Sequence, residues 1–231
     1  MNHIREHRSL VAGAEKKLLI SIARRLPSAI NSDHLSALAL ISMVLGGIAF
    51  SHIDSTPWAG VAFVAMLALN WFGDSLDGTL ARVRDQQRPN YGYYVDHVID
   101  LAGTVALLAG MASSGLMTPV VALGVLAAYL LVAAESFLAT HALAVFRLSF
   151  AGFGPTELRI LLAIGALKVS VAPVVHMAGV EMLLLDVGGS IAILGMLLAF
   201  VASAVRNGVR LYQAEPRLRR VKVAGRMETA S

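Results

Sequence analysis

The sequence contains no cysteine among its 231 residues, and only 15% of its residues are charged. Without cysteine the chain forms no disulfide, carries out no thiolate chemistry and offers no sulfur ligand to a metal ion. The scarcity of charge, together with an apolar share of 57%, sets the chain far from the average soluble domain. An integral membrane protein is therefore the first hypothesis.

Six long apolar runs support this hypothesis. Each run is close to the ~20 residues that an α-helix needs to cross a hydrocarbon core of ~30 Å. The sequence therefore predicts an all-α membrane protein with six transmembrane helices, in a catalytic domain that spans residues 36–212. The runs cover residues 36–52, 58–80, 91–113, 118–143, 157–179 and 183–206.

Positive charge is missing from every second connection between these runs. Every Lys and Arg except Lys168 lies before the first run, in the second or fourth connection, at the start of the fifth run, or near and beyond the end of the last. This pattern follows the positive-inside rule and predicts cytoplasmic N- and C-termini, with a basic tail over 213–231. The excess of positive charge then indicates contact with anionic lipids rather than with nucleic acid. We expect a bacterial or archaeal cell membrane.

Residues 1–35 have no signal-peptide pattern, because their one short apolar run is flanked by charges and lacks a cleavage site. Val11, Leu18, Ile22 and Leu26 recur at near-helical spacing. This spacing predicts an amphipathic helix that lies on the cytoplasmic leaflet, as an anchor or as a cover for a substrate site. Residues 31–33 then supply an N-cap for the first span.

Four aspartates form two helix-spaced pairs. Asp74 and Asp77 fall at the cytoplasmic end of the second run, and Asp96 and Asp100 fall at the start of the third. Residues three or four apart lie on one side of a helix, so two antiparallel neighbours can bring the pairs face to face. Four carboxylates repel one another unless cations compensate. Oxygen ligands favour Mg²⁺, Mn²⁺ or Ca²⁺, and two such ions commonly serve displacement at phosphorus.

The aspartates belong to a longer pattern, DxxDGxxAR from position 74 and GxxxDxxxD from position 92. Its small residues leave room for a ligand near the helix backbone, or allow close helix packing. The pattern resembles the signature of the CDP-alcohol phosphotransferases, integral membrane enzymes of phospholipid synthesis. Nine residues, 83–91, separate the two halves, where the family has about eight, and the extra residue falls in a loop that tolerates insertion.

The resemblance implies a role for each matching residue. Asp74, Asp77 and Asp96 would hold two divalent ions, Mg²⁺ or Mn²⁺. Asp100 would accept the proton of the acceptor hydroxyl and also touch a metal. The donor's CDP moiety would be bound by Gly78, Ala81, Arg82 and Gly92. The resemblance also implies a homodimer, and small residues in the last run fit such an interface: Gly188, Gly189, Ala192 and Gly195.

The resemblance leaves open which substrate is the lipid. We favour CDP-diacylglycerol as donor and a small alcohol as acceptor, with headgroup transfer from CDP-choline or CDP-ethanolamine to a lipid alcohol as the alternative. Members that accept phosphorylated alcohols tend to have a basic fourth span. This chain has no Lys or Arg there, so we expect an unphosphorylated acceptor. Candidate acceptor residues are Glu135, His141 and Arg147.

Other interpretations compete with these. The aspartates could form the cation path of a transporter, or belong to a prenyl-type transferase, although such enzymes use two separate aspartate clusters. Arg82 could anchor the membrane edge, and for His97 and Lys168 a structural role is favoured over a catalytic one. Release of CMP from a CDP-linked substrate distinguishes a CDP-alcohol phosphotransferase from a transporter and from a prenyl-type transferase.

Overall fold

The computed structural model describes residues 4–5, 12–143, 145–146, 155–177 and 179–215. The helices are α1 Ala12–Arg25, α2 Ser32–Ser51, α3 Ala59–Val83, α4 Pro89–Ser113, α5 Pro119–Leu143, α6 Pro155–Val169 and α7 Leu184–Ala214. Short strands β1 (Ile4–Arg5) and β2 (Val145–Phe146) pair in parallel. Strands β3 (Val174–Met177) and β4 (Val180–Leu183) form an antiparallel hairpin between α6 and α7.

Five of the described helices are long and apolar enough to cross a membrane: α2, α3, α4, α5 and α7. The prediction of an all-α membrane protein is confirmed at this level. Helix α6 has only 15 residues, about 22 Å at 1.5 Å per residue, which is shorter than a hydrocarbon core. The fifth predicted span, 157–179, is therefore wrong in its second half, because the helix ends at Val169 and a hairpin follows.

A proline and a glycine explain this difference. Pro173 cannot continue a helix, since it lacks an N–H and clashes with the preceding turn. Gly179 has a φ of 82°, in the left-handed region that glycine tolerates, and it lies between the two strands. A hydrogen bond joins the two ends of the hairpin: the Leu184 N–H donates to the Pro173 carbonyl oxygen over 2.8 Å. Lys168, predicted near the middle of its span, instead lies in the last turn of α6 and is exposed.

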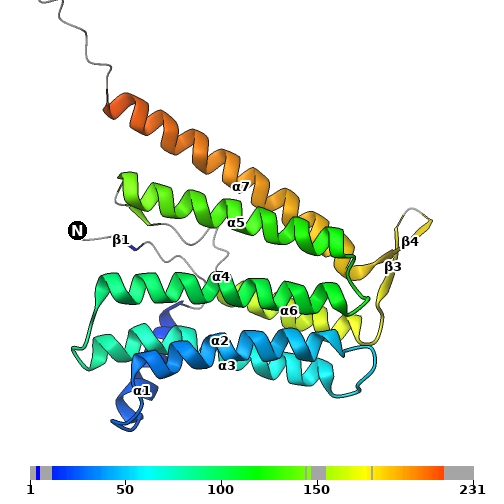
Figure 1. Ribbon diagram of the computed structural model, residues 1–231, viewed down its shortest axis with the longest axis horizontal. Helices are drawn as coiled ribbons and strands as arrows, with labels where there is room; N and C mark the ends of the chain where they lie inside the picture. The colour runs from blue at the N-terminus through cyan, green and yellow to red at the C-terminus, as the bar shows by residue number, and fades with distance from the viewer. Residues whose placement is uncertain (1–3, 6–11, 144, 147–154, 178, 216–231) are drawn as a thin grey trace, which may run out of the picture.

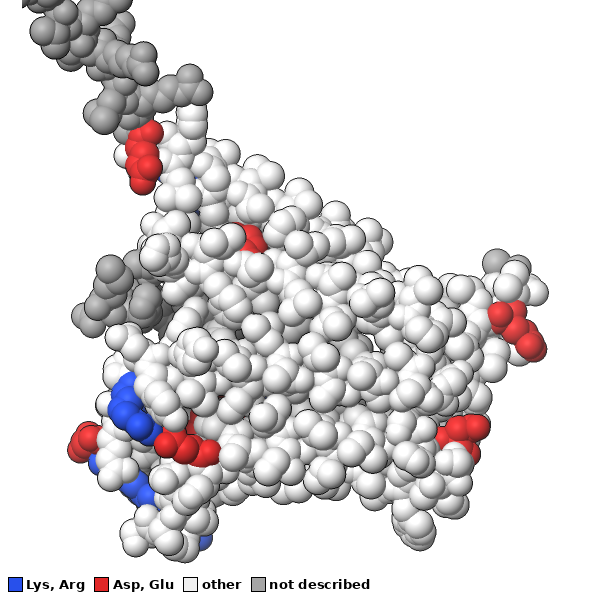
Figure 2. Space-filling view, viewed as in Figure 1, with Lys and Arg blue, Asp and Glu red and all other residues white. Residues whose placement is uncertain are grey.

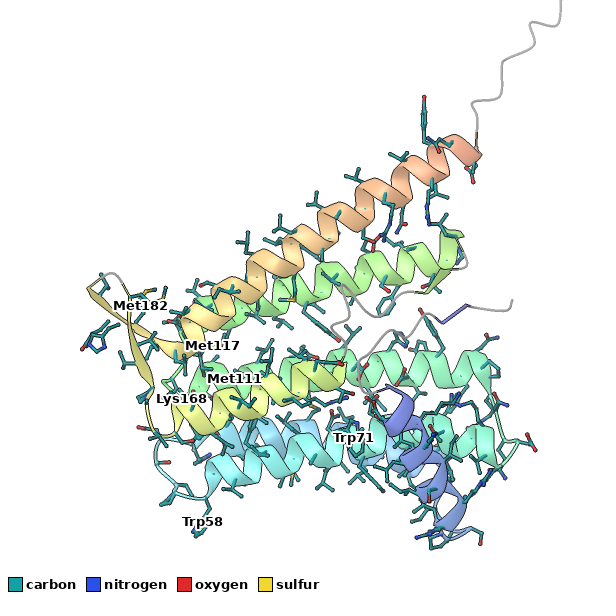
Figure 3. All side chains as sticks on the ribbon, turned by 180° about the vertical axis from the view of Figure 1, so that it is seen from behind. Trp58, Trp71, Met111, Met117, Lys168 and Met182 are labelled. Atoms are coloured by element: carbon teal, nitrogen blue, oxygen red, sulfur yellow. The ribbon has the colours of Figure 1, made fainter. Side chains whose placement is uncertain are left out.

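The helices form a bundle with two different ends (Figure 1). Helix α2 packs against α3 and α4, α6 packs against α3, and α5 packs against α4 and α7. We call the end that holds α1 and the α3–α4 connection the α1 end, and the opposite one the hairpin end. In the view of Figure 2, Lys and Arg side chains gather at the α1 end, with acidic side chains beside them, and the charged side chains visible at the hairpin end are acidic. Figure 3 places Lys168 near the hairpin end.

Two apolar clusters stabilise the bundle. The larger lies toward the hairpin end and includes the edge-to-face pair of Phe50 and Phe63, whose ring centroids are 5.0 Å apart. The smaller joins α1 to α2 and α3 at the α1 end. Its buried members are Leu19, Ala23, Leu35, Leu76 and Leu80. Many large apolar side chains on α5 and α7 remain exposed, as expected of faces that contact lipid.

The predicted N-terminal helix is present as α1, and its inner face differs in part from the predicted one. Leu19 and Ala23 are buried, and Ile22 and Leu26 pack against them, whereas Leu18 is 51% exposed. Val11 lies outside the described residues. The predicted N-cap is confirmed, because the Asn31 side chain accepts a hydrogen bond from the His34 N–H at 2.9 Å. The position of α1 on a leaflet stays a prediction.

Small residues allow α2 to approach its neighbours closely. A Cβ atom added to Gly47 would lie 2.5 Å from the Ala106 carbonyl oxygen, and one added to Gly110 would overlap the Gly47 backbone. In the predicted dimer patch, Gly189 packs against Val121 and Met117 of the same chain, whereas Gly195 has open space around it. Part of that patch therefore serves packing within the chain.

We expect Gly110→Val to destabilise the bundle, because the new side chain would push α4 away from the α2 backbone. Overpacking of this kind costs about 1–3 kcal/mol or more. Thermal unfolding of the purified protein in detergent measures the effect. Gly208→Val is the matched control, since nothing lies within 4 Å of the added Cβ. Equal melting temperatures for the two variants would contradict this account of the α2–α4 crossing.

Candidate functional site

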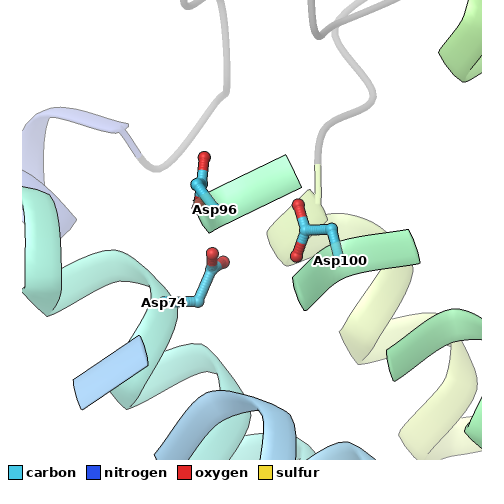
Figure 4. A group of neighbouring side chains, drawn as sticks. All are labelled: Asp74, Asp96 and Asp100. Carbon is cyan, nitrogen blue, oxygen red and sulfur yellow. The ribbon is translucent and has the colours of Figure 1, made fainter. Parts of the chain in front are cut away.

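Three of the four motif aspartates come together near the α1 end of the bundle. Asp74 lies on α3, and Asp96 and Asp100 lie one turn apart on α4. One carboxylate oxygen from each lies within 4.8 Å of the others, and all three side chains are partly buried (Figure 4). Helix α2 packs against both α3 and α4, which holds the two helices in this relation. We call these three residues the carboxylate cluster.

Asp77 lies outside the carboxylate cluster, one turn beyond Asp74. Its Oδ2 accepts a hydrogen bond from the Ser36 hydroxyl at 2.6 Å, and its Oδ1 accepts one from the Gly78 N–H. The Ser32 hydroxyl donates to the Asp77 carbonyl oxygen over 2.9 Å. Two serines in the first turns of α2 therefore fix this part of α3. The sequence analysis considered Ser32 only as one of three N-cap candidates and assigned no role to Ser36.

An arginine from α6 reaches the carboxylate cluster. The Arg159 Nη2 donates to the Asp74 Oδ2 over 2.6 Å, and its Nε donates to the Asn70 Oδ1 over 2.8 Å. Asn70 is buried, and its amide nitrogen donates to the Ala39 carbonyl oxygen over 3.1 Å. Sequence analysis counted Arg159 only among the basic residues around the fourth connection and the start of the fifth run. The sequence did offer one signal, because a charged residue within an apolar helix is expected to have a charged or polar partner.

Glu15 ties α1 to the helices of the site. Its carboxylate accepts hydrogen bonds from the Trp71 Nε1 at 2.7 Å, the Thr156 hydroxyl at 3.4 Å and the Ser75 hydroxyl at 3.5 Å. Ser75 is the chain neighbour of Asp74. Sequence analysis missed this residue, because nothing in the sequence relates it to partners 56 to 141 positions away.

The residues predicted to bind the CDP moiety are placed as follows. The Arg82 Nη2 donates to the Thr79 hydroxyl over 3.1 Å, and its guanidinium lies 3.4 Å from where a Cβ at Gly78 would stand. Gly92 is exposed, with nothing within 4 Å of an added Cβ. Ala81 is half-buried on α3. Open space beside Gly92 leaves room for a ligand near the first turn of α4.

His97 joins α4 to α5. Its ring stacks on Tyr93 with centroids 4.2 Å apart and meets Phe137 of α5 edge-on at 5.1 Å. The ring Nδ1 lies 2.7 Å from the Tyr93 carbonyl oxygen and 3.6 Å from the Asp96 carboxylate. These contacts support the structural role favoured for this residue.

The two described acceptor candidates, Glu135 and His141, take separate positions on α5. Glu135 on α5 accepts a hydrogen bond from the Asn207 amide of α7 at 2.7 Å, which is the bond within the bundle that an intramembrane carboxylate requires. His141 is exposed near the end of α5, and Arg147 lies outside the described residues. Tyr129 of α5 interacts electrostatically with Asp100 and Asp74 of the carboxylate cluster. It hydrogen-bonds Thr104, whose hydroxyl donates to the Asp100 carbonyl oxygen over 2.8 Å.

The carboxylate cluster suits hard divalent cations. Three carboxylates from two helices offer oxygen ligands alone, the donor set preferred by Mg²⁺ and Mn²⁺. The guanidinium of Arg159 beside Asp74 shows that the cluster already attracts positive charge. These residues therefore fit the metal pair that the motif implies.

Comparison with known families agrees with this site. The family model described as CDP-alcohol phosphatidyltransferase matches residues 30–205, well over half of the chain and all of the aspartate motif. A search among curated proteins gives no match. On the extent of the family match, the chain belongs to the CDP-alcohol phosphatidyltransferase family, a family of membrane phosphotransferases in phospholipid synthesis.

Proposed function

We propose that this chain transfers a substituted phosphate from a CDP-linked donor to an alcohol hydroxyl, with release of CMP. The observation that carries the proposal is the carboxylate cluster, with one oxygen of each aspartate within 4.8 Å of the others. Asp74, Asp96 and Asp100 would hold divalent ions, Mg²⁺ or Mn²⁺, with Asp77 as a further ligand. When bound, these ions would neutralise the pyrophosphate and the charge that develops on CMP.

The chain's own groups would then orient and deprotonate the substrates. Asp100 accepts the proton of the acceptor hydroxyl as the alcohol oxygen bonds to the β-phosphorus and the bond from that phosphorus to CMP breaks. Gly78, Ala81 and Gly92 leave space for the CDP moiety, and Arg82 binds a phosphate oxygen. The partly buried position of the cluster would limit the access of water, which competes with the alcohol.

The favoured donor is CDP-diacylglycerol, with a small unphosphorylated alcohol as acceptor. The lack of Lys and Arg on α5 supports this choice, because an acceptor phosphate would need cationic partners. Headgroup transfer from CDP-choline or CDP-ethanolamine to a lipid alcohol is the alternative. The α1 end would face the cytoplasm, in agreement with the basic residues there, and the chain would act as a homodimer.

A cation transporter has no support in the family match, and the described acidic cluster argues against it as well. The cluster lies toward the α1 end, and α7 carries its acidic first-turn residue, Asp186, at the opposite end of the bundle. Asp186 accepts a hydrogen bond from the Thr118 N–H at 2.7 Å and so connects α5 to α7.

Asp100→Asn should abolish CMP release, because an amide keeps the shape of the side chain and removes the base. We expect a loss of about 10²–10⁴-fold in kcat, the usual contribution of a general base, and more if metal binding also weakens. CMP release from CDP-diacylglycerol by purified protein with Mg²⁺ or Mn²⁺ is the measurement. Asp33→Asn, at an exposed ion pair with Arg88, is the matched control. Near-normal turnover by Asp100→Asn would remove Asp100 from its proposed role.

Ser36→Ala should raise the Mg²⁺ or Mn²⁺ concentration needed for half-maximal activity. The Ser36 hydroxyl orients the Asp77 carboxylate, so its loss leaves that ligand free to rotate. We expect a shift of about 10–100-fold, as for other groups that orient metal ligands. Ser42→Ala is the control, since the Ser42 hydroxyl donates to the Leu38 carbonyl oxygen of the same helix. An unchanged metal dependence in Ser36→Ala would count against Asp77 as a ligand.

Glycerol phosphate and inositol phosphate should not serve as acceptors, because α5 offers no Lys or Arg for their phosphate. Incubation with CDP-diacylglycerol and each acceptor, followed by lipid extraction and mass spectrometry, checks this expectation. A panel of unphosphorylated alcohols tested in parallel shows that the preparation is active. Robust product from either phosphorylated acceptor would refute it.

A further inference from the structure

The carboxylate cluster is paired with a cation, Arg159, that the proposed reaction does not use. The Arg159 Nη2 lies 2.6 Å from the Asp74 Oδ2, and the two side chains are only 16% and 21% exposed. Short bonds between a guanidinium and a carboxylate are among the stronger hydrogen bonds in proteins. Asp74 is also the one residue of the cluster on α3, so an ion held by the cluster across the two helices would bind it.

The guanidinium is held from behind by a second contact. Its Nε donates to the Asn70 Oδ1 over 2.8 Å, and Asn70, which is 3% exposed, donates in turn to the Ala39 carbonyl oxygen over 3.1 Å. Both contacts come from elements of the bundle interior, α3 and α2. Arg159 is therefore a fixed part of the site and not a surface side chain that has folded inward.

The positive charge of Arg159 bears on the binding of both the divalent ions and the donor. Three carboxylates this close together in an apolar bundle need compensating positive charge, and Arg159 supplies one unit of it. A divalent ion that approaches Asp74 meets a competing cation on the same carboxylate and is repelled by it. A CDP-linked donor brings the opposite charge, and a planar guanidinium is well suited to bind phosphate oxygens.

We propose that Arg159 is the internal counter-ion of the carboxylate cluster: it holds Asp74 when no divalent ion is bound, competes with the ions for that carboxylate, and binds the donor's phosphate once they are in place. Metal loading and donor binding are thereby coupled through one side chain. This inference rests on the proposed function, since it requires the cluster to bind divalent ions. Arg159 acts as a positioning residue for Asp74 and as a binding residue for the donor.

The test is Mn²⁺ binding to the purified protein in detergent without nucleotide, followed by the electron paramagnetic resonance signal of free Mn²⁺. Arg159→Gln removes the charge and keeps a donor for Asn70. We expect it to bind Mn²⁺ about tenfold or more tightly than the unsubstituted protein, because a competing unit charge is gone. Arg206→Gln is the matched control, since Arg206 contacts Ser203 on α7, and its Mn²⁺ affinity should not change.

The second half of the proposal predicts a change of opposite sign. At saturating Mn²⁺, CDP measured by isothermal titration calorimetry should bind Arg159→Gln about tenfold or more weakly, because a charged phosphate contact is lost. A residue that only joins α3 to α6 would lower the melting temperature of the variant and leave both affinities as they are. That outcome would overturn the proposal.

The result also separates this inference from the proposed function. If the unsubstituted protein binds Mn²⁺ and releases CMP while Arg159→Gln binds Mn²⁺ equally or less tightly, the inference alone fails. If the unsubstituted protein binds no Mn²⁺, both fail. Should Arg159→Gln not fold, Arg159→Lys replaces it. The lysine keeps the competing positive charge but lacks the planar fork of the guanidinium, so Mn²⁺ affinity should stay near that of the unsubstituted protein while CDP binds more weakly. Unchanged CDP affinity in the lysine variant would overturn the proposal.

Discussion

The structure depends on the compensation of negative charge within an apolar bundle. One carboxylate oxygen from each of Asp74, Asp96 and Asp100 lies within 4.8 Å of the others, on helices whose other side chains are mostly apolar. Carboxylates in such a place are unfavourable without cations and donors around them. The bundle supplies such groups from several helices: Arg159 of α6 donates to Asp74, and Ser36 of α2 and the Gly78 N–H of α3 donate to Asp77, just outside the cluster. The divalent ions of the proposed function would complete this compensation.

Apolar packing toward both ends of the bundle holds these polar residues in place. The larger core cluster, with Phe50 and Phe63, fills the bundle toward the hairpin end, and the smaller one, with Leu76 and Leu80, fixes α1 and α2 at the other end. Along α3 the polar residues lie between members of these clusters. Close backbone approach at Gly47 lets α2 serve as the common support of α3 and α4. The carboxylates can therefore hold one geometry despite their mutual repulsion.

Much of the fold followed from sequence, because apolar length and charge asymmetry act locally. The first four spans and the last agree with the described helices. The fifth predicted span does not agree, because the apolar run continues past Pro173 whereas the helix ends before it. Helix spacing placed Asp96 and Asp100 together and placed Asp74 opposite them. It could not show that Asp77 turns toward Ser36, because that contact depends on how α2 crosses α3.

The partners of the site were the least predictable part. Arg159 and Asp74 are 85 positions apart, and Glu15 and Thr156 are 141 apart. No local pattern relates such pairs, and both pairs arise only when α6 packs against α3. Glu135 is the opposite case. Sequence analysis gave this intramembrane acidic residue a functional role, as an acceptor candidate. Its bond to Asn207 on α7 gives it a structural partner instead.

The measurement that tests the central claim most directly is a crystal structure of the protein grown with Mn²⁺, with data collected to show the anomalous signal of manganese. The account predicts manganese peaks bound by oxygen atoms of Asp74, Asp96 and Asp100. It also predicts that Arg159 no longer holds Asp74 as it does without the ion. Ordered carboxylates with no manganese between them at saturating Mn²⁺, and with the Arg159–Asp74 ion pair intact, would contradict it.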